Sequence, residues 1–165
     1  MRAPVGAGAA AERETPIDAQ LLLPVSPALI WEVLTDYERL ADFVPDLIES
    51  RVVSAPGEPR LLAQRGRTRI GVFSAEVAVT LRVDEYPIER LQFTAVKGNV
   101  REMRGEWRIV ALGKGAKVVY SVELVPAFWM PASVGPALVR RHVDTQLQGI
   151  EGEIMRRAEA RGGFS

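Results

Sequence analysis

Residues 72–84 read VFSAEVAVTLRVD, and this stretch decides the fold. Every odd-numbered position from Phe73 to Val83 is apolar, and polar side chains occupy most of the positions between them. Strict alternation places one face of a strand in a core and the other in water, which is typical of an antiparallel sheet. The stretch therefore predicts a long strand with one buried face.

Other parts of the chain show the same period of two. Further strands are expected over residues 17–23, 47–54, 60–70, 91–95, 103–111 and 118–124. Gly71, the pair Gly98-Asn99, and Gly113-Lys114-Gly115 mark turns between neighbouring strands. Short turns between successive strands predict hairpins, and hairpins join strands into an antiparallel sheet.

The period changes after Pro131. Apolar residues then recur at steps of three and four from Val134 to Ala158, which predicts one long amphipathic helix. Near the start of the chain, Ser26 is a good N-cap and Pro27 suits the first position of a short helix that ends near Thr35. A second short helix is expected before Pro45.

These elements predict an α+β fold. A curved antiparallel sheet of six to seven strands would wrap around one long C-terminal helix, with two short helices after the first strand. A single helix facing a curved sheet leaves space between the two layers, and apolar space there would form a pocket.

Composition excludes several chemistries. The 165 residues include no cysteine and one histidine, so disulfides, thiolate catalysis and metal centres built on several imidazoles are excluded. The 21 Lys and Arg residues balance 21 Asp and Glu residues, without the basic excess that nucleic-acid binding favours. We expect no nucleic-acid partner, no cofactor and no metal.

One domain is expected over residues 15–161, with a flexible tail over residues 1–14 and a flexible end over residues 162–165. The first residues lack the apolar stretch of a signal peptide, and no apolar run reaches the roughly 20 residues that cross a bilayer. A cytoplasmic location is therefore expected.

Three stretches resemble the START-like (SRPBCC, birch-pollen-allergen-like) superfamily, of the polyketide cyclase/dehydrase or coenzyme Q-binding type. They are VSPALIWEVLTDYERLADFVP (25–45), GNVREMRGEWRI (98–109) and VELVPAFWMP (122–131). The resemblance spans roughly residues 16–160 and implies the helix-grip fold, with a cavity between the sheet and the last helix. It implies no single reaction, because the superfamily includes carriers, cyclases and regulators.

Large side chains on the predicted inner faces are the candidate ligand contacts, and most of them also suit an ordinary core. The candidates are Phe73, Val77, Phe93, Met103, Trp107, Tyr120, Trp129, Leu138 and His142. Trp107 and Tyr120 would each place one polar group in an apolar wall. Trp129 lies in the junction between the last strand and the long helix, where we expect either a core residue or a pocket rim that touches ligand or membrane.

His142 lies near the edge of the apolar stripe of the long helix. A general base requires an orienting acid, and no acid lies at helical spacing on the pocket side, so a helix-flank role is favoured over a ligand contact. No catalytic residue is assigned.

Several charged or glycine-rich motifs have simpler structural explanations. Arg65, Arg67 and Arg69 share one strand face and are expected on a solvated outer surface rather than at an anion site. Gly113 and Gly115 suit a hairpin turn rather than a phosphate loop, because no helix follows them. The scattered acids are expected to cap helix ends rather than bind metal; they are Asp36, Asp42 and Asp46.

The favoured function is the binding of a hydrophobic or amphipathic small molecule, such as a lipid, an isoprenoid quinone or a polyketide-like ring. Apolar burial would drive this binding. One alternative is a cyclase or dehydratase that uses the same cavity, with Tyr120, His142 or a buried arginine as acid or base. Another is a regulator that binds a protein partner of unknown identity. A transient contact with a membrane surface is also expected.

Overall fold

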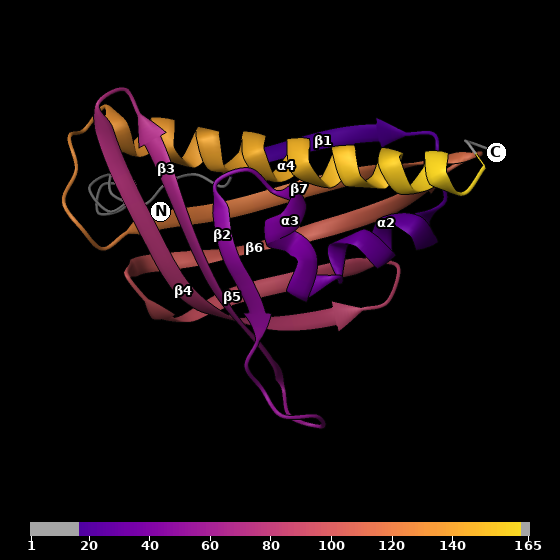
Figure 1. Cartoon of the computed structure of the whole chain (residues 1–165), viewed down its shortest axis with the longest axis horizontal. Coiled ribbons are helices and arrows are strands. Elements are labelled where there is room, and N and C mark those ends of the chain that lie inside the picture. Colours follow the sequence, from indigo (N-terminus) through magenta and orange to yellow (C-terminus); the bar gives the residue numbers. More distant parts are fainter. Residues whose placement is uncertain (1–16, 163–165) are drawn as a thin grey trace, which may run out of the picture.

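The protein is described by a computed structural model over residues 17–162, so the tail expected over residues 1–14 lies outside the described residues. Figure 1 shows the order of the elements along the chain. They are β1 (Ile17–Leu23), α2 (Pro27–Leu34), the 3-10 helix η1 (Tyr37–Arg39), α3 (Leu40–Phe43), β2 (Leu47–Val52), β3 (Arg60–Ile70), β4 (Phe73–Tyr86), β5 (Arg90–Gly98), β6 (Val100–Leu112), β7 (Gly115–Pro126) and α4 (Val134–Ala160).

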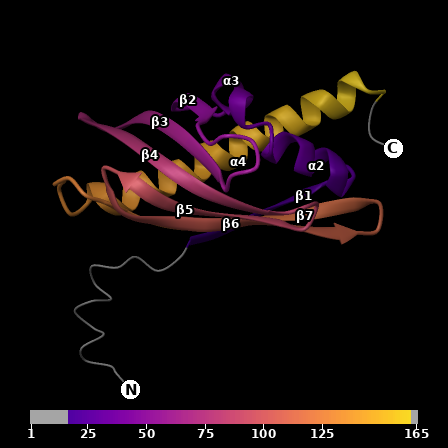
Figure 2. The same cartoon turned by 90° about the horizontal axis from the view of Figure 1, so that it is seen from below.

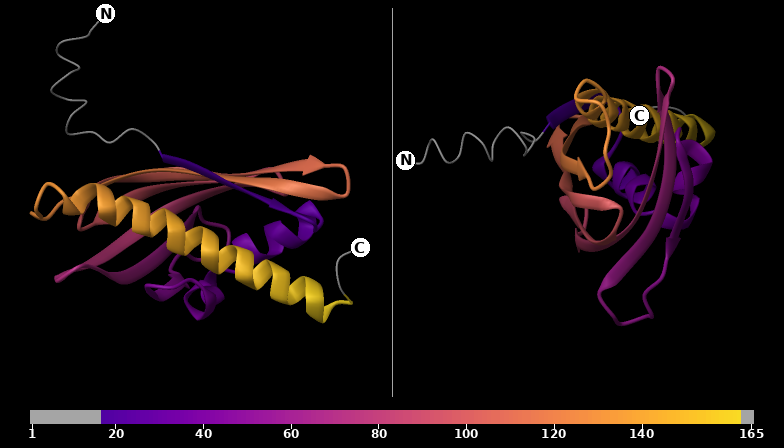
Figure 3. Two further views of the ribbon diagram at one scale, coloured as in Figure 1. Left: turned by 90° about the horizontal axis from the view of Figure 1, so that it is seen from above. Right: turned by 90° about the vertical axis from the view of Figure 1, so that its left-hand side faces the viewer.

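The seven strands form one antiparallel sheet in the order β1-β7-β6-β5-β4-β3-β2. The sheet curves around α4, which lies along its concave face (Figures 2 and 3). This arrangement confirms the predicted α+β class, the number of strands and the single long C-terminal helix. The closed ends of successive hairpins lie alternately at the two ends of the sheet, because neighbouring strands run in opposite directions.

The segment between β1 and β2 starts as the sequence predicts. The Ser26 side chain accepts a hydrogen bond from the backbone N–H of Leu29, and Pro27 is the first residue of α2. The expected second helix is shorter than a regular helix and consists of η1 followed by the single turn of α3. This segment packs beside α4 and covers one part of the concave face.

The core lies between the concave face of the sheet and one stripe of α4. Val139, Val143, Ile150 and Ile154 of α4 are buried against the inner-face residues of the strands. Apolar burial stabilises a fold in proportion to the area that is removed from water. The apolar stripe of this single helix covers much of the concave face of the sheet, so its packing is an important part of that stabilisation.

Arg157 joins the C-terminal end of α4 to α2. Its guanidinium donates to Glu153 at 2.7 Å, to Glu32 at 3.0 Å and to Asp36 at 2.6 Å. Arg161 also bonds Glu32. We call these five residues the ion cluster, and it fixes the position of the last two turns of α4.

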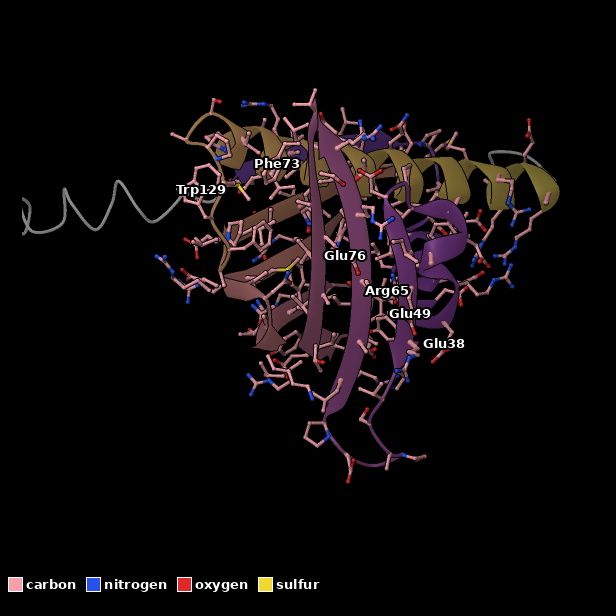
Figure 4. All side chains as sticks on the ribbon, turned by 60° about the vertical axis from the view of Figure 1, so that its left-hand side comes forward. Glu38, Glu49, Arg65, Phe73, Glu76 and Trp129 are labelled. Carbon is pink, nitrogen blue, oxygen red and sulfur yellow. The ribbon has the colours of Figure 1, made fainter. Side chains whose placement is uncertain are left out.

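Three arginines of β3 lie on the outer face, as expected. Arg65 lies 3.6 Å from Glu49 of β2 and 3.6 Å from Glu76 of β4, and Arg67 lies 3.0 Å from Glu76. Figure 4 shows Glu49, Arg65 and Glu76 side by side across the three strands. Exposed pairs of this kind contribute little to stability.

Candidate functional site

A cavity of about 80 Å³ lies between the sheet and the N-terminal half of α4. Its walls come from β3, β4, β6 and β7 on the sheet side, and from the turns of α4 that carry Leu138 and His142. The apolar part of its lining includes Leu47, Ala75, Val77, Val79, Met103, Leu124 and Leu138. The deep wall is therefore the buried face of the alternating strands.

Polar side chains complete the lining. They are Asp46, Gln64, Thr68, His142, Thr145 and Gln146. Arg65 and Arg67 of β3 also border the cavity, but their side chains pair with carboxylates on the outer face. Several already have partners within the protein: Gln64 donates to the Ser50 hydroxyl at 3.1 Å, and the Thr145 hydroxyl donates to the carbonyl of His142 at 3.1 Å. The pocket thus combines an apolar wall with hydrogen-bonding groups, which is the usual character of a small-molecule site.

Four of the nine candidate ligand contacts line this cavity, namely Val77, Met103, Leu138 and His142. Phe93, Trp107 and Tyr120 instead pack on one another. The Trp107 and Tyr120 rings stack at 4.2 Å between centroids, and Phe93 stacks on Tyr120 at 6.1 Å. Phe73 and Trp129 lie outside the lining, close to one end of the sheet (Figure 4). Ligand contact by any of the nine remains a prediction.

His142 has a partner that the sequence analysis did not find. Its Nε2 atom lies 2.8 Å from the hydroxyl oxygen of Tyr120 on β7. Burial lowers the pKa of His142 to about 4 and raises the pKa of Tyr120 above its usual range. Both groups are therefore uncharged near pH 7, and the pair places a neutral imidazole on the pocket wall.

Asp46 links three parts of the pocket rim. Its carboxylate accepts from Arg141 of α4 at 2.9 Å and from the Thr68 hydroxyl of β3 at 2.7 Å, and its carbonyl accepts from the backbone of Arg67. The hydrogen bond from Arg141 holds the pKa of Asp46 below its usual value. Asp46 was expected to cap a helix, but the structure gives it this bridging role instead.

The backbone of Asp46 adopts a left-handed conformation with φ of 72°. Such a conformation is uncommon for residues other than glycine, although aspartate adopts it more readily than most. It turns the chain sharply between α3 and β2, so that the Asp46 side chain faces Arg141. Sequence alone gives no sign of this contact, because Arg141 is 95 residues further along.

The burial of His142 is expected to make stability depend on pH. The pKa of about 4 in the folded protein lies below the ordinary value of 6.5, so the unfolded chain takes up the proton first as pH falls. The free energy of unfolding should have its full value above pH 6.5 and should be roughly 2 kcal/mol lower at pH 4. Urea unfolding measured across this range tests the prediction.

A His142→Gln variant is the control, because it keeps a hydrogen-bonding group near Tyr120 but does not titrate. Its stability should change less between pH 6.5 and 4 than that of the parent protein. Because His142 is the only histidine in the chain, no second imidazole complicates the comparison. Equal pH dependence in the two proteins would contradict the partly buried, neutral state of His142.

Two further properties concern the described part of the chain. Within residues 17–162, no three His, Asp or Glu side chains come together in a way that would hold a metal ion. Over the same residues, no helix has the length and apolar character needed to cross a bilayer.

The sequence profile of the family described as "Polyketide cyclase / dehydrase and lipid transport" matches residues 23–151. The chain belongs to this family. The match covers the pocket walls, the Tyr120–His142 pair and most of α4. A search of curated proteins finds no match in sequence.

Solved structures of low sequence identity share the fold of this family member. The Zhui aromatase/cyclase from Streptomyces sp. R1128 is 20% identical, with a TM-score of 0.77 over 90% of this chain and 98% of that chain. A protein of Thermus thermophilus is 17% identical, with a TM-score of 0.74 over 87% and 99%. The STAR-related lipid transfer protein of Xanthomonas axonopodis is 12% identical, with a TM-score of 0.65 over 84% and 85%.

Proposed function

We propose that this protein binds a hydrophobic or amphipathic small molecule in the pocket between the sheet and α4. The observation that supports the proposal is the pocket lining, which joins an apolar wall to a rim of hydrogen-bonding side chains. The solved structures with the same fold include an aromatase/cyclase and a lipid transfer protein, and the second of these names concerns an apolar ligand class.

The rim favours a ligand with an uncharged polar group. Near pH 7 His142 is neutral, because burial lowers its pKa to about 4. The charge of Asp46 is balanced by Arg141 at 2.9 Å, and the two arginines of β3 in the lining pair with carboxylates of neighbouring strands. The remaining rim groups are amides and hydroxyls, including Gln146 and Thr145. A hydroxyl or carbonyl group on an otherwise apolar molecule satisfies this rim without burying a net charge.

The size of the pocket requires it to widen on binding. The cavity measures about 80 Å³, whereas sites for drug-sized ligands measure about 300–1,000 Å³. Met103 and Leu138 on opposite walls have flexible side chains, and methionine in particular adapts to irregular ligands. The Asp46–Arg141 contact crosses the rim and would separate as α4 moves outward.

A second candidate is a cyclase or dehydratase, and the Tyr120–His142 pair is the observation that favours it. The pair joins a titratable group on the pocket wall to a buried phenol. Such a pair orients the imidazole for proton transfer to or from a bound ligand. Binding without catalysis is favoured, because an imidazole with a pKa of about 4 is a weak base at neutral pH.

Filling the pocket should abolish ligand binding. In a Val77→Phe variant the larger ring occupies much of the cavity, so the affinity for an apolar fluorescent probe should fall at least tenfold, by an order-of-magnitude estimate from the lost apolar contact. The matched control is Val96→Phe, which makes the same change at an exposed position on β5. Fluorescence titration of each variant with the probe measures these affinities.

Native mass spectrometry of the purified protein complements the titration and identifies any molecule that co-purifies. Failure of the parent protein to bind any apolar probe would contradict the proposal. Equal probe affinity of the Val77→Phe and Val96→Phe variants would show that the probe does not bind in this pocket. Turnover of a polyketide-like substrate that is lost in His142→Gln would instead favour the enzyme.

A further inference from the structure

Three connections lie at one end of the sheet, because their strands alternate in direction. They are the β3–β4 hairpin, the β5–β6 turn and the loop from β7 to α4. The end view in Figure 3 shows all three together. The Asn99 carbonyl of the β5–β6 turn accepts a hydrogen bond from Ala127 of the β7–α4 loop at 3.1 Å. We call this region the loop end.

Two large apolar side chains are exposed at the loop end. Val72 at the tip of the β3–β4 hairpin is fully exposed, and Trp129 in the β7–α4 loop is 80% exposed. Figure 4 shows Trp129 projecting from this end of the molecule, near Phe73. Exposed tryptophan on a connecting loop leaves a large apolar area in water, which is typical of a surface that meets a partner.

Three cations lie at the same end of the sheet. Arg69 precedes the hairpin tip, Arg101 follows the β5–β6 turn, and Arg140 lies in the second turn of α4. All three are exposed, and among residues 17–162 none has a carboxylate within 4 Å, unlike Arg67 and Arg65 of the same sheet. These three unpaired cations add positive charge to the loop end.

We propose that the loop end docks on an anionic lipid bilayer. Tryptophan and aliphatic side chains enter the interfacial region of a bilayer, and arginines beside them bind anionic headgroups. The two features occur together here, on loops that can enter the headgroup layer without unfolding a strand. An acidic protein or a nucleic acid would also bind the arginines, but it would give Val72 no apolar surroundings.

The pocket lies directly behind this surface. Thr68 and Ala75, which are paired in the β3–β4 register, line the cavity, and only two residue pairs separate them from the hairpin tip. Leu138 of the second turn of α4 lines it from the other side. The inference extends the proposed function by naming the surface from which a lipid-like ligand enters, but docking itself does not require an occupied pocket.

Vesicle binding tests the proposal. The full chain should co-sediment with vesicles of phosphatidylserine and phosphatidylcholine, but weakly with vesicles of phosphatidylcholine alone, and binding should weaken as salt is raised. Arg69→Ala should reduce the partition coefficient by about fivefold. Trp129→Ala should reduce it by roughly tenfold, because its apolar ring no longer enters the interface.

Matched controls lie at the opposite end of the sheet. Lys114 in the β6–β7 turn is an exposed cation, and Leu112 beside it is an exposed apolar residue. Lys114→Ala and Leu112→Ala should bind vesicles as the parent protein does. Tryptophan emission should shift to shorter wavelength on vesicle binding in the parent, and this shift should be absent in Trp129→Ala.

Three results would overturn the proposal: equal binding to neutral and anionic vesicles, unchanged binding of Arg69→Ala and Trp129→Ala, or an equal loss in the controls. Self-association or nucleic-acid binding through the loop end without vesicle binding would also overturn it. The Val77→Phe variant separates this proposal from the ligand proposal, because it should lose probe binding and keep vesicle binding.

Discussion

Trp107→Ala is expected to lower the free energy of unfolding by about 4 kcal/mol, whereas Trp129→Ala should lower it by less than about 0.5 kcal/mol. Trp107 is buried and stacks on Tyr120 at 4.2 Å, so its removal leaves a cavity in the core. The Trp129 side chain is 80% exposed, so its removal leaves no cavity in the core. The two substitutions delete the same side chain from two different environments.

Urea unfolding followed by far-UV circular dichroism measures both values, since this signal does not rely on tryptophan. Trp107→Ala should retain its folded spectrum at low denaturant but unfold earlier. A loss of several kcal/mol in Trp129→Ala would show that the β7–α4 loop is part of the core, and a small loss in Trp107→Ala would contradict the packed aromatic stack.

Gly149→Ala is expected to destabilise the protein by about 3 kcal/mol, although alanine normally favours a helix. A Cβ atom at position 149 would lie 2.5 Å from the carbonyl oxygen of Phe43 and 2.7 Å from the Cα of Val44. Both are backbone atoms, so no side-chain rotation relieves the overlap. The helix would have to move away from the α3–β2 segment, which also carries Asp46.

Gly152→Ala, on the same helix, provides the control. Outside its own turns of the helix, a Cβ atom there would have no heavy atom of the described residues within 4 Å, so the substitution should raise stability by about 0.5–1 kcal/mol through helix propensity alone. Thermal or urea unfolding of the two variants should therefore give effects of opposite sign. Stabilisation by both substitutions would show that α4 is not in close contact with the α3–β2 segment.

The fold was predictable because its signals are local. The alternation from Phe73 to Val83 and the helical spacing after Val134 each depend on neighbouring residues, and each element formed within a few residues of its expected limits. The register of β3 against β4 follows from the tight turn at Gly71, whose φ of 62° suits glycine. Such signals need no knowledge of distant contacts.

The site was only partly predictable, because it depends on contacts between distant segments. Periodicity places Phe93 on the inner face but not in the pocket. Its ring lies over Gly105 on β6, where an added Cβ would approach the ring to 2.6 Å, and this close approach brings Phe93 into the stack with Tyr120. The sequence pattern likewise could not predict the partner of His142, because Tyr120 lies on β7 rather than on a neighbouring turn of α4.

The ion cluster has a consequence for the widening of the pocket that the proposed function requires. It holds the C-terminal turns of α4 against α2, and the close contact at Gly149 holds the middle of the helix against the α3–β2 segment. Among the described residues, the polar anchors of the N-terminal turns are the rim contact of Arg141 and the hydrogen bond of His142, beside the core packing of Val139 and Val143. If the pocket widens to admit a ligand, as proposed, we expect only the half of the helix that faces the loop end to move, with Gly149 as its pivot.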